Sequence, residues 1–450
     1  MKKLFFLFFW SIFLTLFLSL AAADDYLYLL TSFSGEQNDD QFNVVAGAGD
    51  VNNDGFDDLL VGAPNGNYVK LYFGGSPFDT VADLKFVSYD QWDQFGASVA
   101  GDGDLNGDGF DDILIGAPGY GDFDPGRVYI HFGGADMDTT PDLILDGFGY
   151  YYKFGRSVSM AGDVNKDGYE DLVVGAPNDD YDARGRAYIY FGGENMDNTY
   201  DVYLEGESAF DAFGTSVSWV GDVNKDGYSD IIIGADQWGT SEVIGKAYLF
   251  FGGENIGFNN SVLFEGDNSK PYSYFGRVVS GLKDINGDSY DDFGIMSLLY
   301  INIYSGKTLD VLNKISVTED WNSFQHLTDG GDLNNDGFQE LLVGIENESL
   351  EYAGTAAIYM GSADFDTTAS FLIDGSTPHN YFAHTLDYAG DINNDGHKDI
   401  IIGQLGSSTA PGKAFIYSYG SGSDIHNQRL PEKSSDFYLF QNYPNPFNPI

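Results

Sequence analysis

The 450-residue chain has no cysteine and only 21 basic residues against 69 acidic ones. Without cysteine it can form no disulfide, thiolate metal site or cysteine nucleophile, and it cannot carry the lipid of a bacterial lipoprotein. The formal charge of −48 excludes the basic surface that nucleic-acid binding requires, so no nucleic-acid partner is expected. After the first 20 residues the chain also lacks any long stretch with helical apolar spacing.

Glycine and aromatic residues are abundant instead. The chain has 58 glycines, and 16% of its residues are aromatic. Tyrosine, phenylalanine, valine and isoleucine recur in short runs separated by glycine, which is typical of many short strands joined by tight turns. The composition therefore predicts an all-β protein with a large core.

The N-terminus has the pattern of an export signal. Lys2 and Lys3 precede an apolar run over residues 4–20, and small residues follow at 21–23. This pattern predicts a signal peptide over residues 1–23, cleaved after Ala23. The alternative is an uncleaved membrane anchor, for which a run of 17 residues is at the short limit. No other segment is expected to span a membrane as a helix.

One phrase recurs seven times and is the strongest signal in the sequence. It reads VNNDGFDDLLVG from Val51, VNKDGYEDLVVG from Val164 and INNDGHKDIIIG from Ile392, with intervals of 48 to 62 residues between copies. An aspartate precedes every copy. Internal repetition at such a period indicates stacked units that bury their faces against one another.

Each repeat has the same order of parts. A Phe-Gly start such as Phe95-Gly96 is followed by a short strand, the Asp-rich loop and an apolar strand ending in Gly-Ala-Pro, as at residues 62–64. A third, aromatic strand such as 126–134 and a shorter fourth such as 142–147 complete the unit. Four-stranded units in this number predict a seven-bladed β-propeller of antiparallel blades. A linear solenoid is the alternative, but the ends show no capping units.

The last repeat ends with its third strand at residues 412–420 and has no obvious fourth. Residues 26–32 precede the first Phe start, where a fourth strand would lie. We therefore predict that this N-terminal strand completes the seventh blade, which would remove an open sheet edge.

The repeated loop has the spacing of a calcium site. Its nine positions read Asp-x-Asn-x-Asp-Gly-x-x-Asp, so positions 1, 3, 5 and 9 offer side-chain oxygens and position 7 a backbone carbonyl. Oxygen-only ligands favour Ca²⁺ over the stricter octahedron of Mg²⁺. An EF-hand is disfavoured because position 12, which there needs a glutamate, is apolar in every copy. The competing interpretation is that these residues only form turns.

We predict up to seven bound Ca²⁺ ions with a structural role. Two loops deviate and are expected to bind more weakly: the fifth has Ser289 at position 6, and the sixth has Glu340 at position 9. The predicted ligands, in loop order, are Asp50, Asn52, Asp54, Phe56, Asp58, Asp104, Asn106, Asp108, Phe110, Asp112, Asp163, Asn165, Asp167, Tyr169, Asp171, Asp222, Asn224, Asp226, Tyr228, Asp230, Asp284, Asn286, Asp288, Tyr290, Asp292, Asp332, Asn334, Asp336, Phe338, Glu340, Asp391, Asn393, Asp395, His397 and Asp399.

Phe-Gly, the Asp-rich loop and Gly-Ala-Pro in this order resemble the FG-GAP repeat, over roughly residues 24–420. That repeat forms the N-terminal seven-bladed propeller of integrin α subunits and occurs in many secreted bacterial proteins. The resemblance implies that partners bind the face opposite the calcium loops. Candidate ligand-binding aromatics in the loops of that face are Trp92, Tyr120, Tyr150, Tyr151, Tyr181, Trp238 and Trp321.

Residues 437–450, which follow a linker over 421–436, carry a second resemblance. The string YPNPFNP within FYLFQNYPNPFNPI is similar to the opening of a type A sorting domain of type IX secretion in Gram-negative bacteria. Such a domain is much longer than this segment, so the chain is expected to be truncated at Ile450. The resemblance implies contact with secretion and sorting machinery, and a protein that is released or attached to the outer cell surface.

We therefore expect a secreted or cell-surface binding or adhesion module for an extracellular protein or carbohydrate, and no catalytic residues. One alternative is an extracellular hydrolase or lyase built on the propeller. The close pair His379 and His384 is its only candidate feature, and no nucleophile elbow, phosphate loop or zinc motif supports it. A surface-layer scaffold is the other alternative, since fold alone does not assign function.

Overall fold

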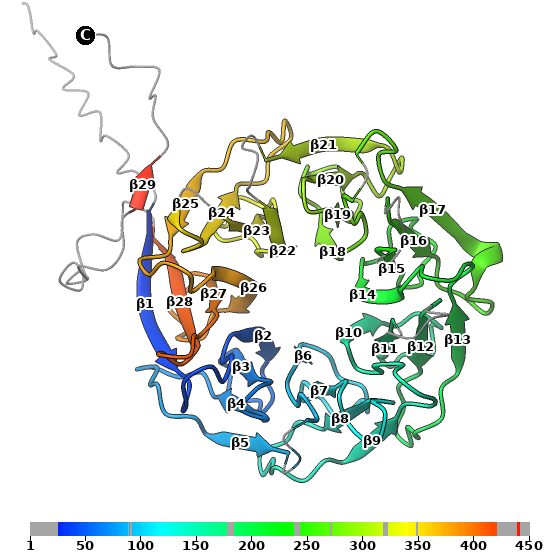
Figure 1. Ribbon diagram of the computed structural model, residues 1–450, viewed down its shortest axis with the longest axis horizontal. Coiled ribbons are helices and arrows are strands. Elements are labelled where there is room, and N and C mark those ends of the chain that lie inside the picture. The colour runs from blue at the N-terminus through cyan, green and yellow to red at the C-terminus, as the bar shows by residue number, and fades with distance from the viewer. Residues whose placement is uncertain are drawn as a thin grey trace, which may run out of the picture.

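A computed structural model describes residues 26–88, 90, 92–177, 184–237, 244–270, 272–317, 323–347, 350–420 and 439–441. In these residues seven antiparallel sheets are arranged as a ring, which confirms the predicted seven-bladed propeller (Figure 1). Six blades run in chain order: β2–β5, β6–β9, β10–β13, β14–β17, β18–β21 and β22–β25 are blades 1 to 6. The seventh combines β26, β27 and β28 with β1.

The second strand of every blade is mainly apolar, whereas the inner strand mixes apolar and polar residues. The inner strands, which line the centre of the ring, are β2 (Val44–Gly49), β6 (Ser98–Ala100), β10 (Ser157–Gly162), β14 (Phe213–Trp219), β18 (Val278–Lys283), β22 (Ser323–Asp329) and β26 (Phe382–Gly390). The second strands are β3 (Asp58–Ala63), β7 (Ile113–Ala117), β11 (Asp171–Ala176), β15 (Ile231–Ala235), β19 (Asp292–Met296), β23 (Leu341–Glu346) and β27 (Asp399–Gln404).

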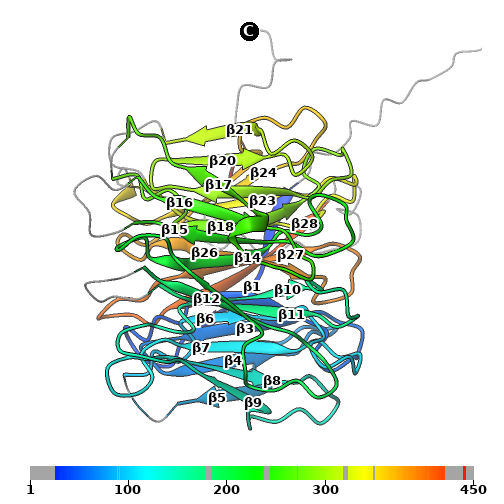
Figure 2. The same ribbon diagram turned by 90° about the vertical axis from the view of Figure 1, so that its right-hand side faces the viewer.

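The outer two strands complete each blade. A side view shows the strands running roughly across the thickness of the ring, from one face to the other (Figure 2). The third strands are β4 (Tyr68–Tyr72), β8 (Arg127–His131), β12 (Arg186–Tyr190), β16 (Lys246–Phe250), β20 (Tyr300–Tyr304), β24 (Thr355–Tyr359) and β28 (Lys413–Gly420). The outer strands are β5 (Leu84–Val87), β9 (Leu143–Asp146), β13 (Val202–Glu205), β17 (Ser261–Glu265), β21 (Val311–Ser316), β25 (Phe371–Asp374) and β1 (Tyr26–Ser34). A 3-10 helix, η1 (Phe258–Asn260), precedes β17, and β29 (Leu439–Gln441) pairs with β25.

The N-terminal strand closes the ring, as predicted. β1 pairs antiparallel with β28, from Tyr26 opposite Gly420 to Ser34 opposite Lys413. Leu27 and Phe33 of this strand are buried, in the cores on the two sides of blade 7. Because the two ends of the propeller share one sheet, the ring cannot open without breaking both the backbone pairing and these two cores.

The Phe-Gly and Gly-Ala-Pro parts of the repeat meet where neighbouring blades pack. The glycine of each Gly-Ala-Pro lies against the backbone carbonyl of the Phe-Gly glycine in the next blade, as Gly62 lies against Gly96 and Gly116 against Gly155. A Cβ atom at Gly62 or Gly116 would collide with that carbonyl. The phenylalanine of every start, such as Phe154, is at most 3% exposed. The signature therefore encodes a close backbone contact between blades together with an aromatic side chain that fills the core.

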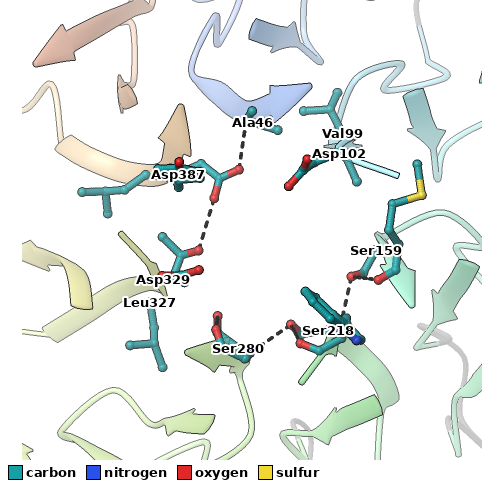
Figure 3. Close-up of a pocket in the computed structure, with 18 of the residues that line it drawn as sticks. Ala46, Val99, Asp102, Ser159, Ser218, Ser280, Leu327, Asp329 and Asp387 are labelled. Atoms are coloured by element: carbon teal, nitrogen blue, oxygen red, sulfur yellow. Dashed lines mark hydrogen bonds between the residues drawn. The ribbon is translucent and has the colours of Figure 1, made fainter. Parts of the chain in front are cut away.

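The inner strands enclose a central cavity of about 350 Å³ (Figure 3). Polar side chains on its wall connect neighbouring blades. Ser159 Oγ accepts a bond from Trp219 N–H at 3.3 Å, and Ser218 Oγ accepts one from Gly281 N–H at 3.2 Å. Asp387 accepts bonds from Gly47 N–H on blade 1 at 3.1 Å and from the hydroxyl of Thr328 on blade 6 at 3.2 Å. These side chains therefore stabilise the contacts between neighbouring blades.

Candidate functional sites on the two faces

Links alternate between the two faces of the ring because the strands of each blade are antiparallel. The Asp-rich loops join the inner strand to the second strand, so all seven lie on one face, here called the aspartate-loop face. The links from second to third strand, and from outer strand to the next blade, lie on the other, here called the opposite face. The predicted metal ligands of all seven loops therefore lie on the aspartate-loop face, whereas Trp92, Tyr120, Tyr150 and Tyr151 lie in links of the opposite face.

Each aspartate loop is a tight turn held by its own side chains. In the first loop Asp50 accepts N–H bonds from Asp54 at 3.0 Å and Gly55 at 2.8 Å, through its two carboxylate oxygens. Gly55 has φ 91°, a conformation in which a glycine is favoured. The same two bonds to position 1 recur in all the other loops at 2.7–3.1 Å, with Ser289 in place of glycine in the fifth.

The carboxylates at position 9 lie at the base of the loops and are fully buried. Asp58 accepts N–H bonds from Val51 at 3.0 Å and from Gly74 at 2.7 Å, and so joins the loop to the link after the third strand. Burial, together with the smaller effect of the carboxylates at positions 5 and 1, raises the pKa of Asp58 to about 8. Position 9 in the other six loops shows the same rise, to about 7 or 8.

The oxygen donors of each loop fit a hard cation, although their carboxylates do not all point to one centre. Within the described residues, no group of three or more acidic or histidine side chains converges as a metal site. In the last two loops, however, Glu340 Oε1 and Asp399 Oδ1 are buried and accept no hydrogen bond. A carboxylate oxygen also keeps a lone pair after accepting one N–H bond. Oxygen-only donors, clustered negative charge and two orphaned oxygens are the chemistry that calcium takes.

Position 8 of the loop has a role that the sequence reasoning missed. Asp111 Oδ2 accepts the N–H of Asp50, in the loop of the preceding blade, at 2.7 Å. Asp57 Oδ2 accepts the N–H of Asp391 at 2.6 Å, across the junction where blade 7 meets blade 1. These two carboxylates connect the second loop to the first and the first loop to the seventh. The signal in the sequence is the additional aspartate that directly precedes position 9 in these two loops.

The opposite face carries exposed aromatic side chains between blades 2 and 3. Two of the candidate ligand-binding residues are Tyr150, which is 65% exposed, and Tyr151, which is 39% exposed. Phe123, which the sequence reasoning missed, is 56% exposed and contacts both rings edge-on, at centroid distances of 5.2 and 6.0 Å. We call Phe123, Tyr150 and Tyr151 the aromatic cluster. Phe148, on the same link as the tyrosines, is also exposed.

The cluster is held by its backbone. Tyr151 N–H donates to the Phe123 carbonyl at 2.6 Å, and the Lys153 ammonium lies 2.7 Å from an Asp124 oxygen. Phe123, Asp124 and Tyr151 all have φ between 51° and 66°, a region that costs energy for residues with a Cβ. The rings are therefore presented by two links that hold each other in place.

The other candidate aromatics differ. Trp92 is 73% exposed on the link between blades 1 and 2. Tyr120 is half-buried, with the Arg127 guanidinium 3.7 Å from its ring centroid, which gives it a packing role. Tyr181, Trp238 and Trp321 lie outside the described residues. So do the predicted signal peptide, the linker over 421–436 and nearly all of the predicted sorting segment.

Comparison with known proteins agrees with this architecture. The FG-GAP repeat family matches residues 42–76, 95–131, 154–190 and 213–250, and the FG-GAP-like repeat family matches residues 332–402. Integrin alpha-5 of Xenopus laevis is 34% identical over 214 residues, which are 44% of this chain and 20% of that protein. Integrin alpha-PS2 of Drosophila melanogaster is 32% identical over 223 residues, or 46% and 16% of the two chains.

A solved structure, BBS1N in complex with ARL6DN, has the same fold. It has a TM-score of 0.54 and 10% sequence identity, and the match covers 91% of this chain and 98% of that one. The chain is thus a seven-bladed propeller protein carrying FG-GAP repeats. More particularly, it is similar to integrin α subunits over less than half of its own length, and the matched region is a fifth or less of the length of the integrins named above.

No helix in the described part of the chain is long and apolar enough to cross a bilayer.

Proposed function

We propose that this protein is a secreted or cell-surface module that binds a protein or carbohydrate through its opposite face, with Ca²⁺ clamping the aspartate loops. The observation that carries the proposal is the integrin α similarity, which spans 44% of the chain. The aromatic cluster supports it. Exposed aromatic rings on a rigid scaffold can stack on sugars or anchor a partner at low entropic cost.

Calcium would be held in an occupied loop by the side chains of positions 1, 3, 5 and 9 and the carbonyl of position 7. Its charge would offset the burial and the carboxylate repulsion that raise the pKa of position 9. The residues of this chain already fix the loop backbone and connect it to the next blade through Asp57 and Asp111. Glu340 remains fully buried with an orphaned oxygen, which supports keeping the sixth loop in the set.

The calcium part is tested by thermal unfolding of the full chain in Ca²⁺ and in excess chelator, with bound calcium counted in the same preparation. Several sites, each worth about 2.7 kcal/mol at a hundredfold excess over Kd, predict a fall of more than about 10 °C in chelator. Mg²⁺ at the same concentration is the control and should restore little of the loss. Unchanged melting with no bound calcium would reduce the loops to turns.

The binding part is tested by applying labelled protein to arrays of glycans and extracellular proteins. We expect the hits to lose at least tenfold in affinity when Phe123 and Tyr150 are both changed to serine. Val81→Ser is the matched control, since Val81 is 71% exposed but lies on the aspartate-loop face. Hits that survive the double change and weaken with the control would place the binding surface on the wrong face.

Export is the remaining part of the proposal. We propose that residues 1–23 direct secretion and that residues 437–450 begin a sorting signal that brings the protein to the outer surface of a Gram-negative cell. Mass spectrometry of the exported protein should show an N-terminus at Asp24. Retention of residues 1–23 in a membrane fraction would favour the anchor instead.

A further inference from the structure

The fifth blade lacks the loop glycine that the other six loops have, and it also lacks a second glycine that blades 1 to 4 have near the aspartate loop. Ser289 stands at loop position 6 with φ 69°, where the other six loops have glycine with φ of 88–96°. Lys307 stands in the link between β20 and β21, at the place of the second glycine in the Phe-Gly-Gly runs that end at Gly75 and Gly134. Both changes occur in one blade and on one face.

Lys307 reaches the predicted metal ligands of its own blade. Its ammonium lies 3.7 Å from Asp288 Oδ2, the carboxylate at position 5, and 5.2 Å from the ring centroid of Tyr290 at position 7. Within the described residues, Asp288 is the ligand carboxylate that has a lysine at ion-pair distance. A positive charge therefore already sits beside the fifth loop.

The asparagine of the fifth loop is also turned differently. In the first and fourth loops the position 3 amide N–H donates to position 5, from Asn52 at 3.0 Å and from Asn224 at 2.9 Å. In the fifth loop the Asn286 amide instead donates to Asp292 Oδ2 at position 9, at 2.9 Å. The contact between positions 3 and 9 is thus made by the protein's own N–H donor.

These contacts work against a divalent ion. Calcium affinity depends on the negative charge and geometry of its ligands. An ammonium group at Asp288 removes part of that charge and repels a second cation. The Asn286 amide also occupies a carboxylate oxygen of position 9 that a metal ion would use, and Ser289 lacks the conformational freedom of glycine at position 6. Screening weakens the repulsion because the lysine is half exposed, but it acts at contact distance.

We propose that Lys307 is a built-in cation for the fifth loop, which therefore holds no Ca²⁺. The inference rests on the calcium binding proposed above. Seven loops less the fifth leave six sites in the full chain.

The test is the number of Ca²⁺ ions bound to the folded full chain, counted by native mass spectrometry at saturating calcium. The wild type should bind six ions, and Asp288→Asn in the fifth loop should also bind six. The matched control Asp226→Asn, at position 5 of the fourth loop, should bind five. Asp284→Asn and Asp222→Asn form a second pair at position 1, with the same expected counts.

Seven ions on the wild type, with six on both fifth-loop variants, would overturn the inference and leave calcium binding intact. No ions on any variant would overturn the calcium proposal itself, and the inference with it. The two failures are therefore distinguishable in one data set.

Discussion

The two faces of this propeller are built from the same seven repeats, yet they differ in how much they vary. On the aspartate-loop face the same hydrogen bonds recur in blade after blade. Asp50 and Asp222, for example, both accept bonds from the backbone N–H groups of positions 5 and 6 of their loops. On the opposite face one pair of links presents the aromatic cluster, while the link between blades 1 and 2 exposes Trp92 instead. The comparison teaches that the contacts repeated in every blade stabilise the ring, while the links of the opposite face can differ from blade to blade without disturbing it.

The largest expected effect distinguishes the buried position 9 of an aspartate loop from its exposed position 5. Asp230 is fully buried and accepts N–H bonds from Val223 at 3.0 Å and Gly252 at 2.8 Å. Asp230→Ala strands two buried donors, at about 1–3 kcal/mol each. We expect the melting temperature in excess chelator to fall by about 4–10 °C.

The control for that prediction is Asp226→Ala, in the same loop. Asp226 is exposed, and water can replace its bond to Tyr228 N–H. In chelator it should shift melting by about 1 °C or less. Equal losses from both variants would show that position 9 has no special part in the apo fold.

A smaller, pH-dependent effect on stability is expected at Asp387, which lines the central cavity. Burial raises the pKa of Asp387 to about 7, above about 3.9 in an unfolded chain. The folded state therefore binds more protons between these values, and the stability contributed by Asp387 is lost as pH rises from about 4 to 7. Asp387→Asn removes this loss and can keep the contacts with Gly47 and Thr328.

We expect Asp387→Asn to melt about 1–3 °C above the wild type at pH 8, with the gap closing towards pH 4.5. Asp329, which also faces the channel and pairs with Lys283 at 3.5 Å, is unchanged in both proteins. Differential scanning fluorimetry across pH measures the gap. A gap that is constant with pH would assign the effect to packing.

The smallest effect is expected on the opposite face. Changing Phe123 and Tyr150 to serine should move melting by about 1 °C or less, because both rings are more than half exposed. Phe154→Ser, a few residues away in the chain but only 1% exposed, should cost about 3–5 kcal/mol. If the double variant also melted early, the cluster would be part of the core and a poor candidate for ligand contact.

Much of this arrangement could be predicted because the repeat states it seven times. The blade order, the positions of the loops and the closing strand before Phe42 all follow from where each part recurs or is missing. Phe123 could not be predicted as a site residue, because its exposure depends on two links from different blades that hold each other. The hydrogen bonds that Asp57 and Asp111 accept were missed for the same reason, since each bond comes from a backbone N–H of another repeat.

The sequence by itself determined the number of blades, the face that carries the acidic loops and the oxygen-only donors within each loop. These features depend on residues close together in the chain, where spacing fixes geometry. Only the tertiary structure decided which glycines meet which carbonyls, which aromatics remain exposed and that Lys307 lies beside Asp288. Those contacts join links and blades that are separate in sequence, and their distances are set by how the blades pack around the ring.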